Sequence, residues 1–325
     1  MKAVYIEQPG GPEALVYGER PKPEPAAGEA LVKVAYSGVN FIDTYHRGGL
    51  YKLPLPAIIG SEGAGTVESV GEGVTNFKPG DRVAYAMARG SYAEYHAVPA
   101  VQLVKVPDAV GLDTAAAAML QGMTAHYLTH STFKLDQGHT ALVHAAAGGT
   151  GRLIVQMARM AGARVIATVG SEAKAKLTLE DGSSAAILYN SQDWVAEVKR
   201  LTGGVDVVYD GVGQATFLKG LDCLKPLGTM VTFGQSSGAN APFDPLLLSA
   251  KGSLYLTRPT LATYIAKRAD LEWRASDLFN WIASGKLKIR IDKAYPLAEA
   301  AQAQKDLEAR KTTGKLILEI GSYGV

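Results

Sequence analysis

Residues 141–151 read Ala-Leu-Val-His-Ala-Ala-Ala-Gly-Gly-Thr-Gly, and this stretch decides the fold of the 325-residue chain. A strand-like segment runs into a turn of small residues and then into the helix-like segment 152–158. Because Gly148 and Gly149 lack β-carbons, the backbone can approach a pyrophosphate, while Gly151 lets the helix pack close to the strand. The backbone N–H groups at the start of the helix, next to Thr150, then face the anion. The glycine spacing departs from Gly-x-Gly-x-x-Gly, so alone it also fits a turn that serves packing only.

The segments around this turn favour nucleotide binding. Apolar β-type runs alternate with helix-like segments, which is typical of a parallel sheet with crossover helices. The expected strands are 141–144, 164–169, 185–189, 205–209, 229–233 and 253–257, and the expected helices are 151–160, 172–180, 193–201 and 215–224. The sequence therefore predicts an α/β fold with a doubly wound parallel sheet.

The flanking regions have a different character. Residues 1–107 contain most of the prolines and consist of short extended segments, at 3–7, 29–36, 60–70 and 81–85. Lys78-Pro79-Gly80-Asp81 is a typical turn, since proline presets one dihedral angle and glycine relaxes the next. We expect a compact β domain here. Helices near 269–284 and 298–310 and a strand at 315–320 follow the parallel sheet, and the final residues 321–325 carry no structural signal.

Composition limits the function classes. With 33 basic and 31 acidic residues the net charge is +2, so no general field attracts nucleic acid or anionic lipid. The single cysteine, Cys223, cannot supply a disulfide or a cysteine-based metal site, which favours a reducing, cytoplasmic location. The N-terminus reaches Glu7 before any apolar stretch of signal length, and no later stretch has about 18 uncharged apolar residues. Secretion and membrane spanning are not expected.

The end of the second strand indicates which cofactor is bound. NAD sites usually place an Asp or Glu there for the ribose hydroxyls, about 20 residues beyond the glycines. Here the chain offers Gly170, Ser171 and Lys174 instead, which leave room for a 2′-phosphate and could bind it, although Glu172 is nearby. NADPH is therefore the predicted cofactor. Lys174 is equally compatible with an ordinary solvated helix lysine.

Four further motifs give the chain a family resemblance. They are Ser-Gly-Val-Asn-Phe-Ile-Asp-Thr-Tyr at 37–45, Gly-Ser-Glu-Gly-Ala-Gly at 60–65, Gly-Asp-Arg-Val at 80–83 and Gln-Gly-Met-Thr-Ala at 121–125. With the glycine-rich turn, they resemble the quinone oxidoreductase, or zeta-crystallin-like, branch of the medium-chain dehydrogenase/reductase superfamily along essentially the whole chain. The resemblance implies a GroES-like catalytic domain, residues 1–121 completed by 262–325, and a Rossmann cofactor domain at 122–261.

The same resemblance implies a zinc-free enzyme. Zinc alcohol dehydrogenases of the superfamily hold their catalytic metal with Cys, His and Cys, where this chain has Asn40, Ser61 and Leu120. These residues do not form a zinc donor set. The remaining metal candidate is His126 with His130, four residues apart on an expected helix, but no third ligand accompanies them, and a surface or core position is the alternative.

Without a Lewis acid, acceptors that delocalise the incoming charge are favoured. A quinone does so, and so does a conjugated enone. We expect NADPH to transfer a hydride, or electrons singly, to a quinone bound beside Asn40, Asp43 and Tyr45, the candidate catalytic residues. The Asn40 amide is expected to donate to the acceptor oxygen, and Tyr45 is expected either to stack on the acceptor ring or to hydrogen-bond it. Alternatively, Asn40 is a turn residue and Tyr45 a cleft wall.

Further cofactor contacts are implied by the resemblance, position by position. The residues that resemble the surface beneath the nicotinamide half are Phe41, Ile42, Asp43, Thr44, Tyr45, Thr124 and Tyr127. Those that resemble the pyrophosphate turn are Gly149 and Thr150, between the cofactor-binding candidates Gly148 and Gly151 of the glycine-rich stretch. The residues that resemble the group around the adenosine 2′-phosphate are Lys174, Tyr189 and Arg310, with Ser171 beside them and Gly170 as a further candidate from the strand end. The residues that resemble the family's strand ends on the nicotinamide side are Gly211, Phe233, Gly234, Gln235, Ser236, Leu256, Thr257 and Arg258.

Two residues depart from the family pattern. Gln121 stands where some relatives carry Lys, and Gly211 where some carry Ser, so substrate preference can differ.

The main alternative activity is NADPH-dependent reduction of alkenals, enones or enoyl thioesters. A more remote one is AU-rich RNA binding or a crystallin-like structural role, against which the near-neutral charge argues. The resemblance also implies a homodimer paired through the edge strand near 253–257, since an isolated apolar edge promotes aggregation.

Overall fold

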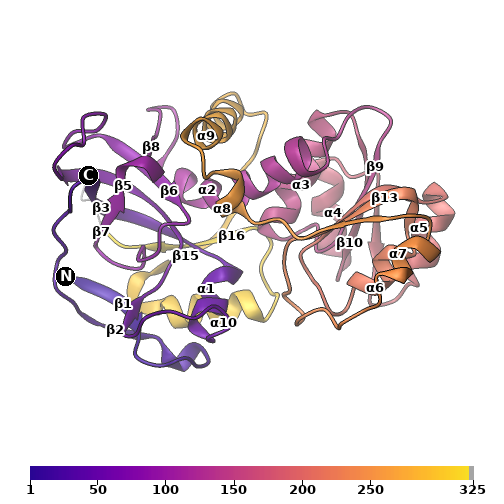
Figure 1. Ribbon diagram of the computed structural model, residues 1–325, viewed down its shortest axis with the longest axis horizontal. Coiled ribbons are helices and arrows are strands. Elements are labelled where there is room, and N and C mark those ends of the chain that lie inside the picture. The colour runs from indigo at the N-terminus through magenta and orange to yellow at the C-terminus, as the bar shows by residue number, and fades with distance from the viewer. Residues whose placement is uncertain (322–325) are drawn as a thin grey trace. The chain divides into compact units, whose positions relative to one another are not determined.

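The computed structural model describes residues 1–321, and residues 322–325 of the C-terminal tail lie outside the described part. The chain divides into two compact units (Figure 1). Unit 1 comprises Met1–Met123 and Tyr264–Val325, and unit 2 comprises Thr124–Thr263. One unit is thus assembled from two distant segments of the chain, and the other is continuous.

Unit 2 contains the parallel sheet that the sequence predicts. Its strands lie in the order β11-β10-β9-β12-β13-β14, all parallel to their neighbours. Their bounds are β9 Thr140–Val143, β10 Arg164–Val169, β11 Ala185–Leu188, β12 Val205–Asp210, β13 Leu224–Thr232 and β14 Tyr255–Thr257. In chain order this is 3-2-1-4-5-6, the doubly wound arrangement in which ligands bind where the strand order reverses. That point lies at β9 and β12, and β9 leads into the glycine-rich turn.

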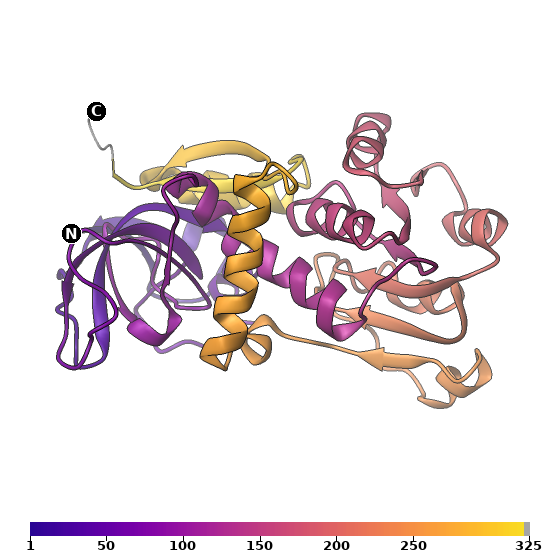
Figure 2. The same cartoon turned by 90° about the horizontal axis from the view of Figure 1, so that it is seen from above.

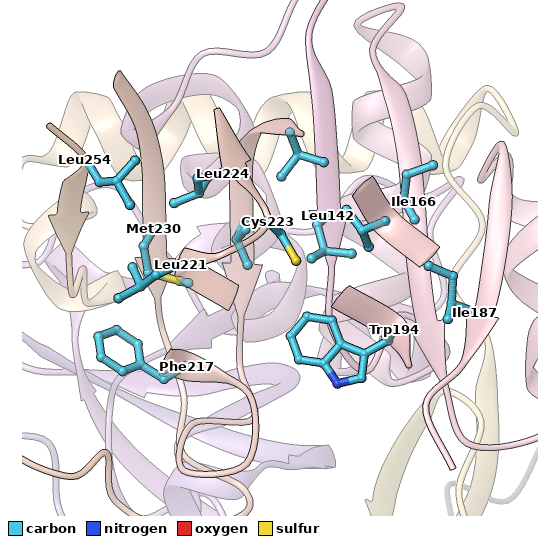
Figure 3. Packing of buried hydrophobic residues seen from close by; sticks show 13 residues of the cluster. Leu142, Ile166, Ile187, Trp194, Phe217, Leu221, Cys223, Leu224, Met230 and Leu254 are labelled. Carbon is cyan, nitrogen blue, oxygen red and sulfur yellow. The ribbon is translucent and has the colours of Figure 1, made fainter. Parts of the chain in front are cut away.

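Helices connect these strands. They are α3 Gly149–Met160, α4 Glu172–Asp181, α5 Trp194–Thr202, α6 Phe217–Leu221 and α7 Leu246–Ala250, and the short α8 Leu261–Tyr264 ends the unit. Trp194 from α5 and Phe217 from α6 pack on Leu142, Ile166 and other sheet residues in one hydrophobic cluster (Figure 3). The lone cysteine, Cys223, is buried in this cluster, where burial raises the pKa of its thiol to about 12.

Unit 1 is rich in antiparallel β structure. A seven-stranded sheet has the order β15-β16-β3-β5-β6-β8, with β7 also paired to β3, and a second sheet has the order β2-β1-β4. The bounds are β1 Lys2–Ile6, β2 Val16–Glu19, β3 Glu29–Val39, β4 Ala57–Ile58, β5 Glu62–Val70, β6 Arg82–Ala86, β7 Tyr95–Pro99, β8 Val104–Lys105, β15 Ile291–Pro296 and β16 Lys315–Glu319. The late strand β16 pairs antiparallel with β3, so the C-terminal segment completes the sheet begun by the N-terminal one.

Unit 1 also contains helices. They are α1 Phe41–Arg47, α9 Arg268–Ala283 and α10 Ala300–Glu308, together with α2 Leu112–Tyr127, which continues into unit 2. Helix α10 packs against β16 and α1, and α9 is the long orange helix of Figure 2. None of the helices within residues 1–321 combines the length and the hydropathy needed to span a membrane.

Candidate active site

The β3–α1 junction carries the predicted catalytic motif. Strand β3 ends at Val39, Asn40 has an extended backbone, and α1 begins at Phe41. The backbone N–H of Asn40 donates to Asp43 Oδ2 at 2.9 Å, and the N–H of Asp43 donates to the Asn40 carbonyl at 3.1 Å. These reciprocal bonds fix the start of the helix. The motif residues are therefore held on a rigid strand–helix junction.

Asp43 is fully buried, and both of its carboxylate oxygens accept hydrogen bonds. Ser61 Oγ donates to Oδ1 at 2.6 Å, and the Tyr92 hydroxyl donates to Oδ2 at 3.2 Å, in addition to the Asn40 N–H. Burial raises the pKa of Asp43 to about 6, although the hydrogen bonds from Ser61 and Asn40 oppose the shift. In this geometry Asp43 supports the junction, and its predicted role beside the acceptor stays a prediction.

A buried polar cluster lies beneath the junction. We use this name for Asn40, Glu62, Lys315 and Gln121. Lys315 Nζ forms an ion pair with Glu62 and donates to Asn40 Oδ1 at 2.7 Å. Asn40 Nδ2 donates to Glu62 Oε1 at 3.1 Å, and Gln121 Nε2 donates to Asn40 Oδ1 at 3.3 Å. Both ends of the Asn40 amide are thus engaged within unit 1.

Local backbone features make room for this cluster. A β-carbon at Gly38 would lie 1.7 Å from Glu62 Oε1, so only glycine fits beside the carboxylate. The other oxygen of Glu62 accepts the backbone N–H of Leu120. Burial lowers the pKa of Lys315, while the neighbouring Glu62 opposes that shift. The role of Lys315 and Glu62 was not evident in the sequence, where both residue types are normally exposed.

Aromatic side chains surround Tyr45. Its ring lies 5.8 Å from Tyr51 in an edge-on arrangement and 6.5 Å from Phe41, and Tyr51 also packs edge-on against His46. Such a group suits a flat, conjugated ligand, because aromatic faces and edges attract one another. Tyr51 was not singled out in the sequence, because it lies in a loop after α1. The remaining residues of the motif, Ile42 and Thr44, belong to the same helix.

The glycine-rich turn of unit 2 has the predicted strand–turn–helix form. Ala145 has φ +51, and Gly148 precedes α3 with no side-chain cap on the helix. A β-carbon at Gly151 would lie 2.4 Å from the Ala145 carbonyl oxygen and 2.8 Å from Ala146 Cα. The helix start is therefore a narrow backbone cradle with uncapped N–H groups, which fits a pyrophosphate. Gly149 and Thr150 form its first helical residues.

A second group lies at the carboxyl ends of β10 and β11, which are adjacent. A β-carbon at Gly170 would lie 2.8 Å from the Tyr189 hydroxyl, and Asn190 Nδ2 donates to the Gly170 carbonyl at 3.0 Å. Ser171 caps α4 by accepting the N–H of Lys174 at 3.4 Å. The structure thus gathers Gly170, Ser171, Lys174 and Tyr189 in one place. Asn190, which the sequence analysis did not single out, joins them.

The third predicted group follows β12, β13 and β14. The Phe233 ring lies against Gly211, where a β-carbon would be 3.0 Å from it, and Ser236 N–H donates to the Gly211 carbonyl at 3.3 Å. Arg258 donates to the Gly234 carbonyl at 3.4 Å and to Gln235 Oε1 at 3.3 Å. Leu256 and Thr257 belong to β14 itself. The structure thus joins Gly211 to Phe233 and Ser236, and Arg258 to Gly234 and Gln235, at the carboxyl edge of the sheet.

Three predicted contacts stay outside these groups. Thr124 and Tyr127 are buried residues of α2, at the start of unit 2. Arg310 belongs to unit 1, after α10, in a left-handed backbone conformation with φ +55. Its membership of the 2′-phosphate group stays a prediction, because Lys174 and Tyr189 belong to unit 2.

Comparisons with known proteins agree with these features. Residues 26–108 match the alcohol dehydrogenase GroES-like domain, and residues 149–276 match a domain described as zinc-binding dehydrogenase. A quinone oxidoreductase of Pseudomonas aeruginosa is 44% identical over 321 residues, covering 98% of this chain and 99% of that protein. The chain belongs to the quinone oxidoreductase branch of the medium-chain dehydrogenase/reductase superfamily. The GroES-like and Rossmann domains predicted from the sequence are thereby confirmed.

Two further family members are informative. The crystal structure of Escherichia coli quinone oxidoreductase, complexed with NADPH, superposes with a TM-score of 0.96 at 42% identity and covers 98% of this chain and 100% of that chain. A 2-haloacrylate reductase of a Burkholderia species is 41% identical over 327 residues, covering 97% of this chain and 98% of that protein. The similar proteins are therefore named after two kinds of acceptor, quinones and a 2-haloacrylate.

A zinc ion, which the description of one matching domain implies, does not fit the residues of this quinone oxidoreductase family member. Asn40 Oδ1 accepts from the Lys315 ammonium, Ser61 Oγ donates to Asp43, and Leu120 has no donor side chain. Zinc in proteins is held by thiolate, imidazole and carboxylate groups, and a neighbouring ammonium repels it. His126 and His130 stack their rings 4.4 Å apart, and within residues 1–321 no group of three or more His, Cys, Asp or Glu is placed to hold a metal.

Proposed function

We propose that the protein is an NADPH-dependent quinone reductase that works without zinc. The observation that carries the proposal is the buried polar cluster. In it Asn40, which stands at a zinc-ligand position of the zinc-dependent relatives, is held instead by Lys315 and Glu62. An acceptor reduced there must itself spread the incoming negative charge. A quinone does this over its conjugated ring.

The cofactor fits the residues of unit 2. The uncapped start of α3 would hold the pyrophosphate, and the group at Gly170, Ser171 and Lys174 would hold the 2′-phosphate. No carboxylate follows the last residue of β10 directly, which favours NADPH over NADH. The solved Escherichia coli relative with bound NADPH supports the same choice.

When bound, NADPH supplies a hydride from C4 of its nicotinamide ring. The residues of the chain orient the acceptor and exclude alternative positions, and orientation alone can lower a barrier by several kcal/mol, roughly 7–11 in the best cases. Tyr45 and its aromatic neighbours offer a surface for the quinone ring. Solvent supplies the proton. The predicted bond from the Asn40 amide to the acceptor competes with the bond from Asn40 Nδ2 to Glu62.

A steady-state panel tests this function. NADPH and NADH would each be offered with 1,2-naphthoquinone, 9,10-phenanthrenequinone, an alkenal and crotonyl-CoA. We expect the highest kcat/KM for NADPH with a quinone. Negligible quinone turnover beside strong alkenal turnover would reject the proposal in favour of the second candidate.

That second candidate is an NADPH-dependent reductase of conjugated carbonyl compounds. The similarity to a 2-haloacrylate reductase over 97% of this chain favours it. The same site serves both activities, because an activated carbon–carbon double bond also accepts a hydride without a metal. The two candidates differ only in the acceptor, which the panel compares directly.

The proposal includes a homodimer in the cytoplasm. Strand β14 is an edge of the unit 2 sheet, and Tyr255 on it is 61% exposed. Edge strands with exposed apolar side chains favour pairing with a second copy. A reducing location is supported by the single cysteine, which is buried in the core of unit 2.

A further inference from the structure

Lys315 is an unusual element of the site. It enters from β16, its exposed fraction is 2%, and that of Glu62 is 0%. Removing two charges from water costs several kcal/mol per ion, of the order that the attraction between them returns, so such a pair contributes little net stability. A buried ion pair of this kind is better explained by the geometry that it imposes on its neighbours.

The geometry that it imposes concerns the Asn40 carboxamide. The ammonium faces Asn40 Oδ1, and the carboxylate faces Asn40 Nδ2, so the amide has one orientation that satisfies both charges. The reversed amide would point its N–H groups at the ammonium and its oxygen at the carboxylate. Asn40 Oδ1 is therefore fixed as an acceptor, and it accepts a second bond from Gln121 Nε2.

Gln121 is the accessible member of the cluster. It is half-buried, whereas the other three members are at most 2% exposed. Because Asn40 Oδ1 accepts one N–H of Gln121, the orientation of the Gln121 amide follows from that of Asn40. In the part of the chain described, the Gln121 side chain makes no other hydrogen bond, which leaves its second N–H available for a ligand.

We propose that Gln121 donates this N–H to the carbonyl oxygen of the acceptor, and that the Lys315–Glu62 pair acts as a positioning device for it through Asn40. The inference rests on the proposed reductase function and deepens it. Negative charge develops on the acceptor oxygen as the hydride arrives, and a preorganised donor stabilises that charge. The ammonium strengthens the donor, because hydrogen-bonded groups in a buried network polarise one another.

The first test compares Gln121→Leu with Gln121→Glu, which keeps the shape of the side chain and removes its donors. Each is expected to lower kcat/KM for 1,2-naphthoquinone about tenfold, the loss of roughly one hydrogen bond. The Kd for NADPH, measured by fluorescence in the absence of acceptor, is expected to change less than about twofold, since no cofactor contact is removed. Unchanged kcat/KM in both variants would overturn the role of Gln121.

The second test addresses the positioning pair. Lys315→Met is expected to lower the same kcat/KM about tenfold, and the double variant Lys315→Met/Gln121→Leu is expected to lose no more than Gln121→Leu alone, because both act through one hydrogen bond. The matched control is Tyr295→Phe on the neighbouring strand β15, which removes a partly buried hydrogen bond of 2.6 Å from the tyrosine hydroxyl to Asp306. It is expected to lower the melting temperature without affecting kcat/KM.

The third test guards against a Lys315→Met variant that does not fold. In Lys315→Met/Gln121→Lys the ammonium is supplied from α2, within reach of Asn40 Oδ1, and restored quinone turnover is the expected result. Additive losses in the Lys315→Met/Gln121→Leu variant, or no recovery in a folded Lys315→Met/Gln121→Lys variant, would overturn the positioning role. If the wild type reduces alkenals and not quinones, the proposed function fails, and the same variants assayed with an alkenal still decide this inference.

Discussion

Asp43 illustrates how the site constrains a single residue. Its carboxyl group is buried and its pKa is raised to about 6, from an ordinary value of 3.8, chiefly by burial. A raised acid pKa means that the folded state binds the proton more tightly than the unfolded state does. The ionisation of Asp43 therefore costs stability progressively as the pH rises from about 4 to 6, by up to about 3 kcal/mol.

Asp43→Asn tests this linkage. The variant has no group to ionise at this position, so the stability of the wild type relative to it should fall between pH 4.5 and pH 7. Chemical denaturation at both pH values measures the change. A constant difference across this range would show that the carboxyl group has an ordinary pKa in the folded protein.

Lys174 and Arg310 carry a prediction about cofactor choice. Replacing either with Ala should weaken NADPH binding by about 1–3 kcal/mol, the value of a lost charged hydrogen bond, and should affect NADH much less. Titration of each variant with both cofactors measures the ratio. Equal weakening of NADPH and NADH would remove that residue from the 2′-phosphate group.

The buried polar cluster marks the limit of sequence reasoning at this scale. Asn40 was singled out from its motif, but its partner Lys315 lies 275 residues away and belongs to a residue type that is normally exposed. No local pattern connects the two. Tyr51 and Asn190 were missed for a related reason, because each follows a regular element and gains its contacts only when the chain is folded.

At the scale of elements, the start of α3 depends on Gly151. Gly151→Ala would place a β-carbon 2.4 Å from a backbone carbonyl oxygen, which cannot move without displacing the turn. We expect a loss of about 1–3 kcal/mol in stability, typical of overpacking, and at least about tenfold weaker NADPH binding. Denaturation curves and cofactor titration measure these effects.

Gly148→Ala is the graded comparison. Its β-carbon would lie 3.2 Å from the same carbonyl oxygen, and Gly148 has φ −77, so the destabilisation should be smaller. Equal stability losses in the two variants would show that crowding at Gly151 is not what limits the turn.

Most of the parallel strands were predictable because they are short, apolar and buried, whereas the edge strand β14 is partly exposed. The expected strand at 164–169 coincides with β10, and that at 205–209 differs from β12 by one residue. Strand β15 was missed, because its sequence, Ile-Asp-Lys-Ala-Tyr-Pro, is largely exposed and lacks an apolar run. It forms because β16 provides a hydrogen-bonded neighbour, which is a property of the folded sheet.

For the whole molecule, the dimer is testable at β14. Tyr255→Lys places a charge on an exposed edge strand and should convert the dimer to monomer, since edge charges oppose pairing. Light scattering at several protein concentrations measures the change. Val101→Lys, at a position 67% exposed in unit 1, is the control and should stay dimeric. A wild type that is monomeric at every concentration would refute the dimer itself.

The pairing of β16 with β3 has a consequence for biosynthesis. Unit 2 is one continuous segment and can fold as soon as it leaves the ribosome, whereas the sheet of unit 1 waits for residues translated after it. Until then residues 36–39 of β3 lack their neighbour β16, and Glu62 lacks its cation. A nascent chain stalled before Lys315 should therefore expose the unpaired end of β3 to aggregation, and the docking of β16 both pairs this end and neutralises the Glu62 carboxylate.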